Sequence, residues 1–474
     1  MEPTVHFAHR RFYSNTVKAI EIETRPHPDL CFVFVQHAFS PSLEFFGAIN
    51  NRVAAIVPKG SSAKSNPQVI RQLKEKFGSR FHDSIGRHKL ADPNFTLEWL
   101  RRVTDDRPFA ILEYGGYFAP TASRISNDIR LGANLVGFVE GTENGIKGSD
   151  DGQTKGYRDV IDGIAHPVIS KSRSRIKGIM DIEIGPAIVY ATDAIFRRRL
   201  GCSLKHWSNS IGVIGLGSIG KGVLSTLIKD NRVPMVFDTD LSLMAELATR
   251  HNRVVSQDAI LRSSDVLFLN TGSCFLSNSP ALLDQLKNYA LLVLCTSGDV
   301  EAGIPQLIHS GHLQYIELES NPEIAVFSTR KGKRVRVLLA SDCIGQAPNM
   351  SMQDGSSSPA NLMSDMEFYA MGSYLCSTGH KLSPATIHES PGKLEDIIIR
   401  EWLGEFHPDC VSSCKAPVQT DHRDSANNST ALEPTGDNDQ GSAAQTLHPC
   451  DTSVKSNTTK WAAGSSTKSF DERQ

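Results

Sequence analysis

The stretch Ile211-Gly212-Val213-Ile214-Gly215-Leu216-Gly217-Ser218-Ile219-Gly220-Lys221-Gly222 decides the fold of this chain. An apolar strand runs directly into the pattern G-x-G-x-x-G, and helix-forming residues follow. Glycines at 215, 217 and 220 suit a tight turn, a close backbone approach to a pyrophosphate, and close packing of helix on strand. Ser218 and Ile219 begin the helix, whose first N–H groups and positive dipole end would face the phosphates. The stretch therefore predicts a dinucleotide-binding βαβ unit.

An acidic residue follows at the expected distance. The next apolar strand, residues 233–237, ends at Asp238, which lies 23 residues after Gly215 (238 − 215). An acid at about this spacing binds the ribose 2′-OH of a dinucleotide. The ordered series of strand, glycine turn, helix, strand and acid favours cofactor binding over a turn that serves packing alone. Because Asp238 would repel a 2′-phosphate, the sequence predicts NAD in preference to NADP.

Composition limits the classes of protein to consider. The chain has 474 residues, with 39% hydrophobic and 22% charged residues, which predicts two or three globular domains. The net charge of −2 predicts neither a nucleic-acid partner nor a membrane surface as partner. No apolar run approaches the roughly 20 residues of a membrane span. The nine cysteines are scattered, as in a reduced cytoplasmic protein, and no second ligand pair joins Cys410 and Cys414, so no metal site is predicted.

Short apolar strands alternate with helical stretches through the chain, which predicts an α/β fold. In the first part we expect strands at residues 32–35, 53–57, 109–112 and 135–139, and helices at 67–77 and 97–103. A long connecting helix is expected to begin at Pro186, a favoured first-turn residue, and to end near Leu200-Gly201. In the second part we expect strands at 211–214, 233–237, 265–270, 290–295, 313–318 and 334–340. Helices between most of them predict a doubly wound parallel sheet of the Rossmann type.

The last part returns to helices and then changes in composition. Helices are expected at residues 364–374 and 393–403, and from about residue 405 polar residues dominate, which predicts a disordered tail. The predicted domains are residues 1–200, 201–344, 345–404 and the tail 405–474.

Several segments outside the glycine stretch resemble S-adenosyl-L-homocysteine hydrolase. They occur in colinear order over residues 30–404 and are Gly137–Gly145, Val168–Arg173, Asp181–Leu200 with Ala191-Thr192-Asp193, Asn270-Thr271-Gly272, Leu286–Glu301 and Gly332–Ala340. The resemblance implies a split α/β substrate domain built from both chain ends, with the Rossmann NAD domain inserted between its parts. It implies a nucleoside-like small-molecule ligand, and it leaves a homo-oligomer open because the family's C-terminal arm is replaced by the polar tail.

The resemblance also assigns expected roles to single residues. Lys171 aligns with the family's catalytic lysine, His37 with its early histidine, and Glu113 with one acid of its acid pair. The residues that it places near NAD are Thr142, Asn270, Thr271 and Gly272, and the carboxyl edge of the predicted sheet adds Ser297 and Asp299. Simpler interpretations stay open: Lys171 in a solvated basic loop, His37 capping a strand, and Glu113 as an ordinary loop acid.

The chain departs from the family at the chemistry. Arg175 stands where the lysine's aspartate partner is expected, Gly141 replaces a glutamate, and Ser297 replaces a histidine. We therefore expect an NAD-binding, adenosylhomocysteinase-like protein without efficient hydrolysis of adenosylhomocysteine, with either a regulatory role or a different substrate. One alternative is an NAD-dependent oxidoreductase of the D-2-hydroxyacid dehydrogenase type, for which His309 and His312 are the nearest downstream histidines. The other alternative is a working hydrolase with relocated catalytic groups.

Overall fold

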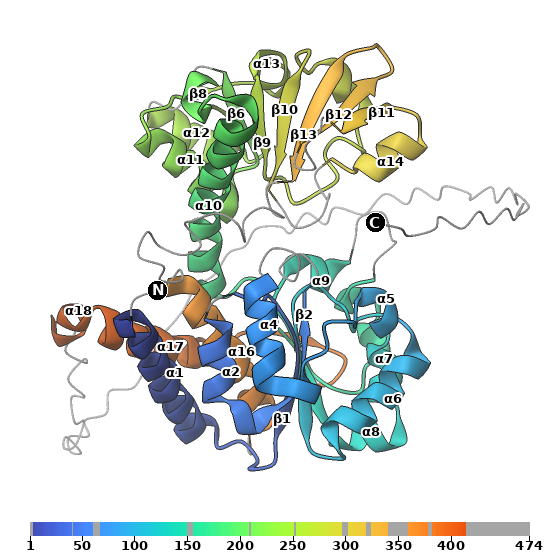
Figure 1. Cartoon of the computed structure of the whole chain (residues 1–474), viewed down its shortest axis with the longest axis vertical. Helices are drawn as coiled ribbons and strands as arrows, with labels where there is room; N and C mark the ends of the chain where they lie inside the picture. The colour runs from blue at the N-terminus through green and yellow to red at the C-terminus, as the bar shows by residue number, and fades with distance from the viewer. Residues whose placement is uncertain are drawn as a thin grey trace, which may run out of the picture. The chain divides into compact units, whose positions relative to one another are not determined.

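The computed structural model describes residues 3–39, 41–59, 67–148, 155–207, 210–250, 253–295, 302–318, 324–339, 359–377 and 382–413. The predicted α/β class is confirmed, because these residues form two sheets that are mainly parallel, with helices between the strands (Figure 1). The predicted domain boundary at 344/345 lies outside the described residues. The predicted disordered tail lies outside them from residue 414 on, and its first residues belong to helices.

The first sheet is parallel throughout and has the strand order β14-β5-β4-β3-β1-β2. Every residue of β1, β2, β3 and β5 is buried, as expected for a parallel sheet covered on both faces. The strands expected from the sequence in this part are confirmed. The bounds are β1 Cys31–Gln36, β2 Val53–Pro58, β3 Phe109–Glu113, β4 Leu135–Glu140, β5 Val168–Ser170 and β14 Ile387–Glu389.

Alternate residues of each strand serve opposite faces of this sheet, because side chains in a strand alternate sides. Phe32 and Phe34 of β1 belong to one core, and Cys31, Val33 and Val35 belong to the other. Helices α1, α2, α16 and α17 cover the first face, and α5 to α8 cover the second (Figure 1). The bounds are α1 Pro3–Thr24, α2 Ser42–Ala48, α4 Pro67–Phe77, α5 Arg87–Leu90, α6 Pro93–Thr104, α7 Ala122–Ser126, α8 Ile129–Asn134, α9 Glu143–Lys147, α16 Pro359–Leu375, α17 Gly392–Phe406 and α18 Pro408–Ser413.

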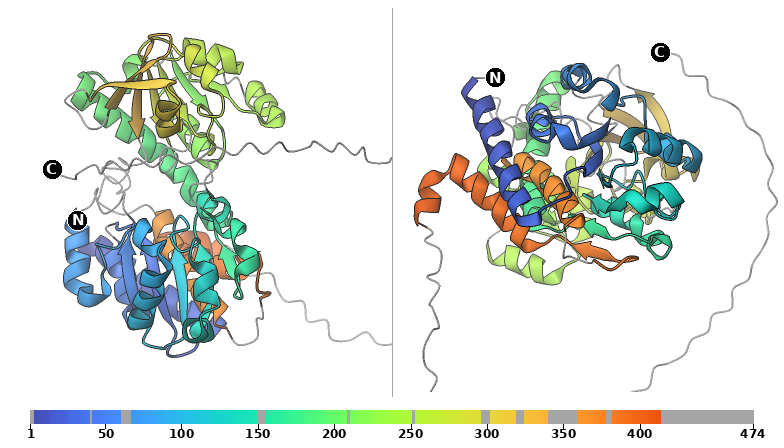
Figure 2. Two further views of the ribbon diagram at one scale, coloured as in Figure 1. Left: turned by 90° about the vertical axis from the view of Figure 1, so that its right-hand side faces the viewer. Right: turned by 90° about the horizontal axis from the view of Figure 1, so that it is seen from below.

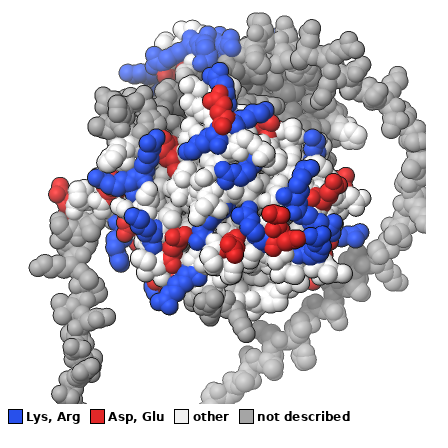
Figure 3. Space-filling model, turned by 60° about the horizontal axis from the view of Figure 1, so that its bottom comes forward, with Lys and Arg blue, Asp and Glu red and all other residues white. Residues whose placement is uncertain are grey.

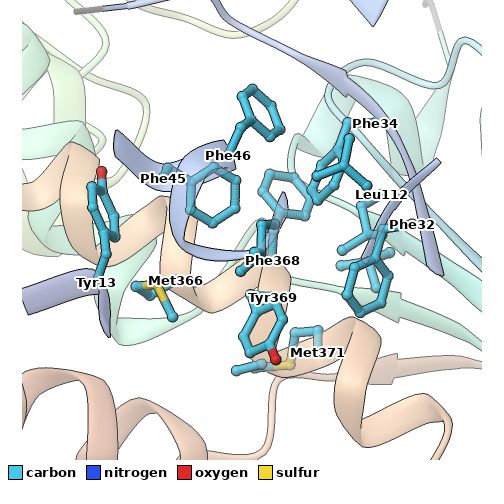
Figure 4. Close-up of a cluster of buried hydrophobic side chains, with 14 of the residues drawn as sticks. Tyr13, Phe32, Phe34, Phe45, Phe46, Leu112, Met366, Phe368, Tyr369 and Met371 are labelled. Atoms are coloured by element: carbon cyan, nitrogen blue, oxygen red, sulfur yellow. The ribbon is translucent and has the colours of Figure 1, made fainter. Parts of the chain in front are cut away.

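Residues near the C-terminus complete the core of the first sheet. Helix α16 packs on β3 and β4, and β14 pairs with β5. Met366, Phe368, Tyr369 and Met371 of α16 lie among the aromatic side chains of β1 and α2 (Figure 4). Helices α1 and α17 lie side by side, as the view from below shows (Figure 2). Two parts of the chain that are distant in sequence therefore share one hydrophobic core.

The second sheet has the strand order β11-β12-β13-β10-β9-β6-β7-β8. Six neighbouring strands of this sheet are parallel: β8, β7, β6, β9, β10 and β13. They follow the 3-2-1-4-5-6 order of a Rossmann sheet. The bounds are β6 Ile211–Ile214, β7 Met235–Phe237, β8 Arg253–Val254, β9 Val266–Leu269, β10 Ala290–Leu294, β11 Leu313–Leu318, β12 Ile324–Thr329 and β13 Arg334–Leu339. The helices are α11 Ser218–Lys229, α12 Leu241–Thr249, α13 Gln257–Ser263 and α14 Ile304–His309.

The expectation of a wholly parallel second sheet is wrong at one place. Strand β12, which the sequence analysis missed, runs antiparallel to both β11 and β13. A tight turn joins β12 to β13, with Gly332 at φ 76 and the Gly332 N–H bonded to the Thr329 carbonyl. A hairpin of this kind needs only a few turn residues, so it replaces the helical crossover that two parallel strands require.

The connecting helix α10 runs over Arg175–Leu200, so the expectation that it begins at Pro186 is wrong. Ser174 caps its N-terminus by accepting a hydrogen bond from the Lys177 N–H, and Pro186 lies inside the helix. A proline there cannot bond the carbonyl four residues earlier, that of Ile182. That carbonyl instead faces Gly222 of α11, where an added Cβ would lie 2.3 Å from the oxygen. The close crossing of α10 and α11 thus accommodates the proline.

The charged surface is mixed in sign. On the face shown in Figure 3, basic and acidic side chains are interspersed. No helix in the described part of the chain combines the length and the apolar character that crossing a bilayer requires.

Candidate functional site

Each sheet has a point where the strand order reverses, and the carboxyl edge beside that point is where open α/β sheets bind ligands. In the second sheet this point lies between β6 and β9, and in the first sheet between β1 and β3. The predicted cofactor residues that follow β6 and β9 lie at the first of these points, and His37 and Glu113 lie at the second.

The glycine turn after β6 has the geometry that its spacing predicted. Gly215 has φ 83, and a Cβ there would lie 2.6 Å from the Asn270 carbonyl oxygen. A Cβ at Gly220 would lie 2.0 Å from the Gly215 carbonyl oxygen. A Cβ at Gly217 would meet no heavy atom of the described residues within 4 Å. Gly215 and Gly220 are therefore required by the packing of the turn, whereas Gly217 borders open space.

The first turn of α11 lacks a side-chain cap. Gly217 is its N-cap residue and has no side chain, and no side chain of the described residues accepts from the N–H groups of Ser218, Ile219 and Gly220. The next two helices of this sheet are capped: Asp240 accepts from the first turn of α12, and Ser256 accepts from that of α13. The start of α11 therefore keeps the exposed donors that bind a phosphate.

Asp238 stands at the end of β7, beside the glycine turn. Its carboxylate accepts hydrogen bonds from the Leu216 N–H at 2.6 Å and from the Asp240 N–H at 2.9 Å. These bonds hold the carboxylate next to the turn, where the sequence analysis placed an acid for a ribose hydroxyl.

Asn270 follows β9 and borders the same turn. Its side-chain Oδ1 and Nδ2 atoms are both buried, and among the described residues neither has a hydrogen-bond partner. Leaving a buried amide unpaired costs about 1–3 kcal/mol for each group. An unpaired donor and acceptor beside an uncapped helix start therefore indicate a place for a ligand.

The other predicted cofactor residues differ in their positions. Thr271 follows Asn270, and its hydroxyl donates to the Ser273 carbonyl at 3.0 Å, while Gly272 has φ 60 and borders open space. Thr142 belongs to the first sheet, where its hydroxyl accepts from the Gly145 N–H and donates to Glu140. Ser297 and Asp299 lie outside the described residues.

The carboxyl edge of the first sheet carries a pair of buried glutamates, Glu113 and Glu140, on neighbouring strands. Glu113 accepts from the N–H groups of Tyr117 and Phe118 and from the Tyr157 hydroxyl. Burial and the neighbouring Glu140 raise the pKa of Glu113 to about 8. Burial also raises the pKa of Glu140.

Glu140 binds the other side of the same turn. Its carboxylate accepts from the N–H groups of Gly115 and Gly116 at 2.8 and 2.7 Å, and from both the N–H and the hydroxyl of Thr142. The N–H groups of the turn after β3 are thus occupied by the protein's own carboxylates. Glu113 is thus a buried acid bound to this turn, and its catalytic role stays a prediction.

Lys171 lies at the end of β5 and is fully buried, so the interpretation of a solvated loop is wrong. Its ammonium donates to the Ser364 hydroxyl at 2.7 Å and to the Ser364 carbonyl at 2.8 Å, and lies 3.1 Å from Glu367 Oε2. The Phe368 ring lies under it, with the centroid 4.1 Å away. Burial lowers the pKa of Lys171, and the neighbouring carboxylate of Glu367 opposes that shift.

The acid partner of Lys171 was missed because it lies 196 positions later in the chain (367 − 171). Arg175, where the resemblance expects an aspartate, begins α10 and pairs with Glu395 and Asp396 of α17. The signal that could have found the partner is the pair of acids, Asp365 and Glu367, in the otherwise apolar helix α16.

A second polar pair, Gln36 and Asp365, lies at the end of β1 in the first sheet. Asp365 accepts from the Gln36 side-chain amide and from the Tyr13 hydroxyl, and burial raises its pKa to about 7. Because the Gln36 Nε2 group faces this carboxylate, its Oε1 atom is the free end, and this buried oxygen accepts no hydrogen bond from the described residues.

His37 is partly buried at the reversal point of the first sheet. Its ring stacks on Phe39 with the centroids 5.3 Å apart, and the Tyr114 ring lies 5.6 Å away. Burial lowers the pKa of His37, and Lys59 and Lys177 lower it further. The imidazole is therefore neutral at pH 7.

The histidines of the dehydrogenase alternative lie elsewhere. His309 ends α14 and His312 immediately precedes β11. Since β11 has the same direction as β13, these histidines lie at the amino edge of the sheet, away from the glycine turn. Among the described residues, no cluster of three or more His, Cys, Asp or Glu side chains is arranged to hold a metal ion.

No protein-family model and no curated protein matches the chain. Among solved structures, the chain is similar to the apo form of D-lactate dehydrogenase from Escherichia coli, at 16% identity over 50% of this chain and 72% of that chain, with a TM-score of 0.31. A putative D-3-phosphoglycerate dehydrogenase from Ralstonia solanacearum gives 15% identity over 69% and 98%, with a TM-score of 0.33. A phosphoglycerate oxidoreductase from Vibrio cholerae gives 14% identity over 54% and 79%, with a TM-score of 0.30. At these identities and TM-scores, the similarities carry no argument about activity.

Proposed function

We propose that this protein is an NAD-dependent oxidoreductase that acts on a small hydroxyl-bearing molecule. The observation that carries the cofactor part is the unpaired buried amide of Asn270 beside the glycine turn. A ligand with both acceptor and donor atoms would satisfy this amide.

The residues of this edge fit NAD. The start of α11 would hold the pyrophosphate, Gly217 would leave room for it, and Asp238 would accept from the ribose hydroxyls. Asp238 would face the added phosphate of NADP, so NAD is preferred. When bound, NAD supplies the hydride acceptor or donor.

The first sheet supports a hydroxyl-bearing ligand without a negative charge. The N–H groups of the turn after β3 are filled by Glu113 and Glu140, so they offer no anion site. Lys171 pairs with Glu367, Lys177 pairs with Asp181, and Arg87 donates to the Gly115 carbonyl. Among the described residues, Gln36 Oε1 is a buried acceptor without a hydrogen-bond partner, and it needs a donor such as a hydroxyl.

This charge pattern favours a nucleoside-like ligand over a 2-hydroxy acid. It is also compatible with an adenosylhomocysteinase-like ligand, but hydrolysis of adenosylhomocysteine should be absent or weak. Arg175 is tied to Glu395 and Asp396 and cannot act as the missing acid. Release of homocysteine at a rate that Lys171→Ala abolishes would establish a hydrolase instead.

Calorimetric titration of the full chain with NAD and NADP tests the cofactor. We expect binding of NAD, much weaker binding of NADP, and no binding of NAD to Gly217→Val, whose side chain would fill the pyrophosphate space. Gly178→Val is the matched control, because a Cβ at Gly178 also meets no heavy atom within 4 Å but lies in α10. Equal affinity for both cofactors would remove the role of Asp238, and no binding of either would refute the proposal.

The ligand class is tested separately on the NAD-loaded protein. Adenosine serves as the uncharged hydroxyl-bearing probe, and D-lactate and D-glycerate serve as anionic probes. We expect NADH absorbance with adenosine and none with the hydroxy acids. If only D-lactate or D-glycerate reduced the bound NAD, the protein would still be an oxidoreductase, but the proposed ligand class would be wrong.

A further inference from the structure

A line of buried polar groups joins β5, the turn after β3, and α16. The Tyr114 hydroxyl lies 2.8 Å from the Ser364 hydroxyl, which lies 2.7 Å from the Lys171 ammonium. The Lys171 ammonium lies 3.1 Å from Glu367, and the side chains of both are 0% exposed. Glu367 is held from the other side by the hydroxyls of Ser174 and Ser390.

Stability alone does not account for this arrangement. Taking a lysine and a glutamate out of water costs several kcal/mol for each ion, and apolar side chains of similar size would be as stable or more stable. Buried charges whose proton affinities are shifted gather at sites that handle protons. The line also reaches the reversal point of the first sheet, since the Tyr114 ring adjoins His37.

We propose that Lys171, Ser364 and Tyr114 form a line that carries one proton, and that Glu367 is the positioning residue for Lys171. This inference rests on the proposed oxidoreductase function. Oxidation of the hydroxyl-bearing carbon would break its C–H bond, and NAD, held by the start of α11 and by Asp238, would supply the hydride acceptor. The O–H proton of the ligand passes to Tyr114 as Tyr114 gives its own proton to Ser364. Ser364 gives its proton to the neutral amine of Lys171, and the ammonium that results pairs with the Glu367 carboxylate.

Burial and the surrounding charges shift the pKa of Lys171 in opposite directions. Burial lowers the pKa of Lys171, whereas Glu367 and Asp365 of α16 and Asp181 of α10 raise it. Burial raises the pKa of Glu367, and burial also raises the pKa of Tyr114.

Coupled titration in the full chain tests the line. Lysines are labelled with ¹³C at Cε and tyrosines at Cζ, and Lys171→Arg and Tyr114→Phe assign the two resonances. In the unmodified protein we expect Lys171 to titrate below the other lysines and Tyr114 Cζ to shift in the same pH step. Ser364→Ala should leave the Lys171 step and reduce the Tyr114 shift, because only the long direct contact of 3.4 Å between the Lys171 ammonium and the Tyr114 hydroxyl then joins the two groups.

Glu367→Gln should lower the titration midpoint of Lys171 by about 1–3 pH units, since an opposite charge at this distance contributes a shift of that size. Glu367→Asp should restore part of the shift. Glu405→Gln is the matched control, because Glu405 is also a nearly buried carboxylate bonded to a cation, Arg11, and lies away from Lys171. It should leave the Lys171 midpoint in place.

A Tyr114 resonance that stays fixed during the Lys171 step would overturn the proton line, and this outcome needs no variant. A Lys171 midpoint that Glu367→Gln leaves unchanged would overturn the role of Glu367. Calorimetry reports on the oxidoreductase proposal separately: absence of NAD binding refutes that proposal while the titration still decides the line.

Discussion

The two reversal points of this protein use the same backbone chemistry in opposite ways. In the second sheet, the Leu216 N–H of the turn after β6 donates to Asp238, but the N–H groups at the start of α11 have no side-chain acceptor among the described residues, and Asn270 is unpaired beside them. In the first sheet, the turn after β3 donates its N–H groups to Glu113 and Glu140. Both turns present consecutive N–H groups at the carboxyl edge of a parallel sheet.

This difference in the partners of the backbone N–H groups shows how two sheets of similar architecture can suit different ligands. An edge with unfilled donors can take a phosphate, as the helix start in a dinucleotide site does. An edge whose donors are filled by the protein's own carboxylates is closed to anions and offers acceptors instead, such as Gln36 Oε1. The fold alone therefore predicts where a ligand binds in each sheet. Whether the backbone N–H groups there are already bonded to carboxylates decides the charge of the ligand.

The largest expected effect is the loss of Glu140. In Glu140→Leu, the N–H groups of Gly115 and Gly116 and both donors of Thr142 lose their acceptor. At about 1–3 kcal/mol for each buried donor, partly offset by water, we expect the free energy of unfolding to fall by about 3–5 kcal/mol. Urea unfolding measures it. Asp238→Asn, with fewer bonds, should cost much less, and equal costs would remove the contrast between the edges.

The glycines of the second turn should separate stability from binding. Gly220→Ala puts a Cβ 2.0 Å from the Gly215 carbonyl oxygen, so we expect a loss of about 1–3 kcal/mol in unfolding free energy. Gly217→Ala meets open space and should leave stability nearly unchanged while it weakens NAD binding. Thermal unfolding and calorimetry on the two variants decide this. The opposite ranking in stability would show that the turn is not packed as described.

The buried acid Glu113, at the carboxyl edge of the first sheet, should make the free energy of unfolding depend on pH. Folding raises the pKa of Glu113 from 4.5 to about 8, so between these values the folded state binds more protons than the unfolded state. The contribution of Glu113 is present below pH 4.5 and is lost as the pH rises toward 8. The slope for one proton approaches about −1.4 kcal/mol per pH unit. Urea unfolding across this range should show the decline, and Glu113→Gln should flatten it. A stability that rises over the same range would contradict the assignment.

Much of the second sheet was predictable because its signals are local. The spacing of Gly215, Gly217 and Gly220 predicts their geometry, since Gly215 and Gly220 contact atoms a few residues away or at the end of the neighbouring strand β9, and Gly217 borders open space. Strand β12 was missed because its hairpin depends on a short turn at Gly332, whereas the expected pattern placed helices between strands.

The first sheet's site was less predictable because its partners are distant in sequence. Lys171 could be singled out by resemblance, but Glu367 and Ser364 reach it only after the chain has formed the second sheet and returned in α16. Glu113 and Glu140 each end an apolar strand, and only the pairing of β3 with β4 shows that they fill one turn. The local sequence pattern thus predicts the helices and strands. The pairing of distant segments decides which charged side chains of the site meet.

The most direct test of the unfilled edge is the variant Asn270→Leu, measured for both stability and NAD affinity. Because the Asn270 amide is buried without a partner among the described residues, replacing it with an apolar side chain of similar size should raise the unfolding free energy of the NAD-free protein by about 1 kcal/mol. The same change should weaken NAD binding about tenfold, since the amide then has nothing to offer the cofactor. We therefore expect higher stability together with weaker NAD binding. Lower stability with unchanged NAD affinity would show that Asn270 serves the fold and that this edge is not kept open for a ligand.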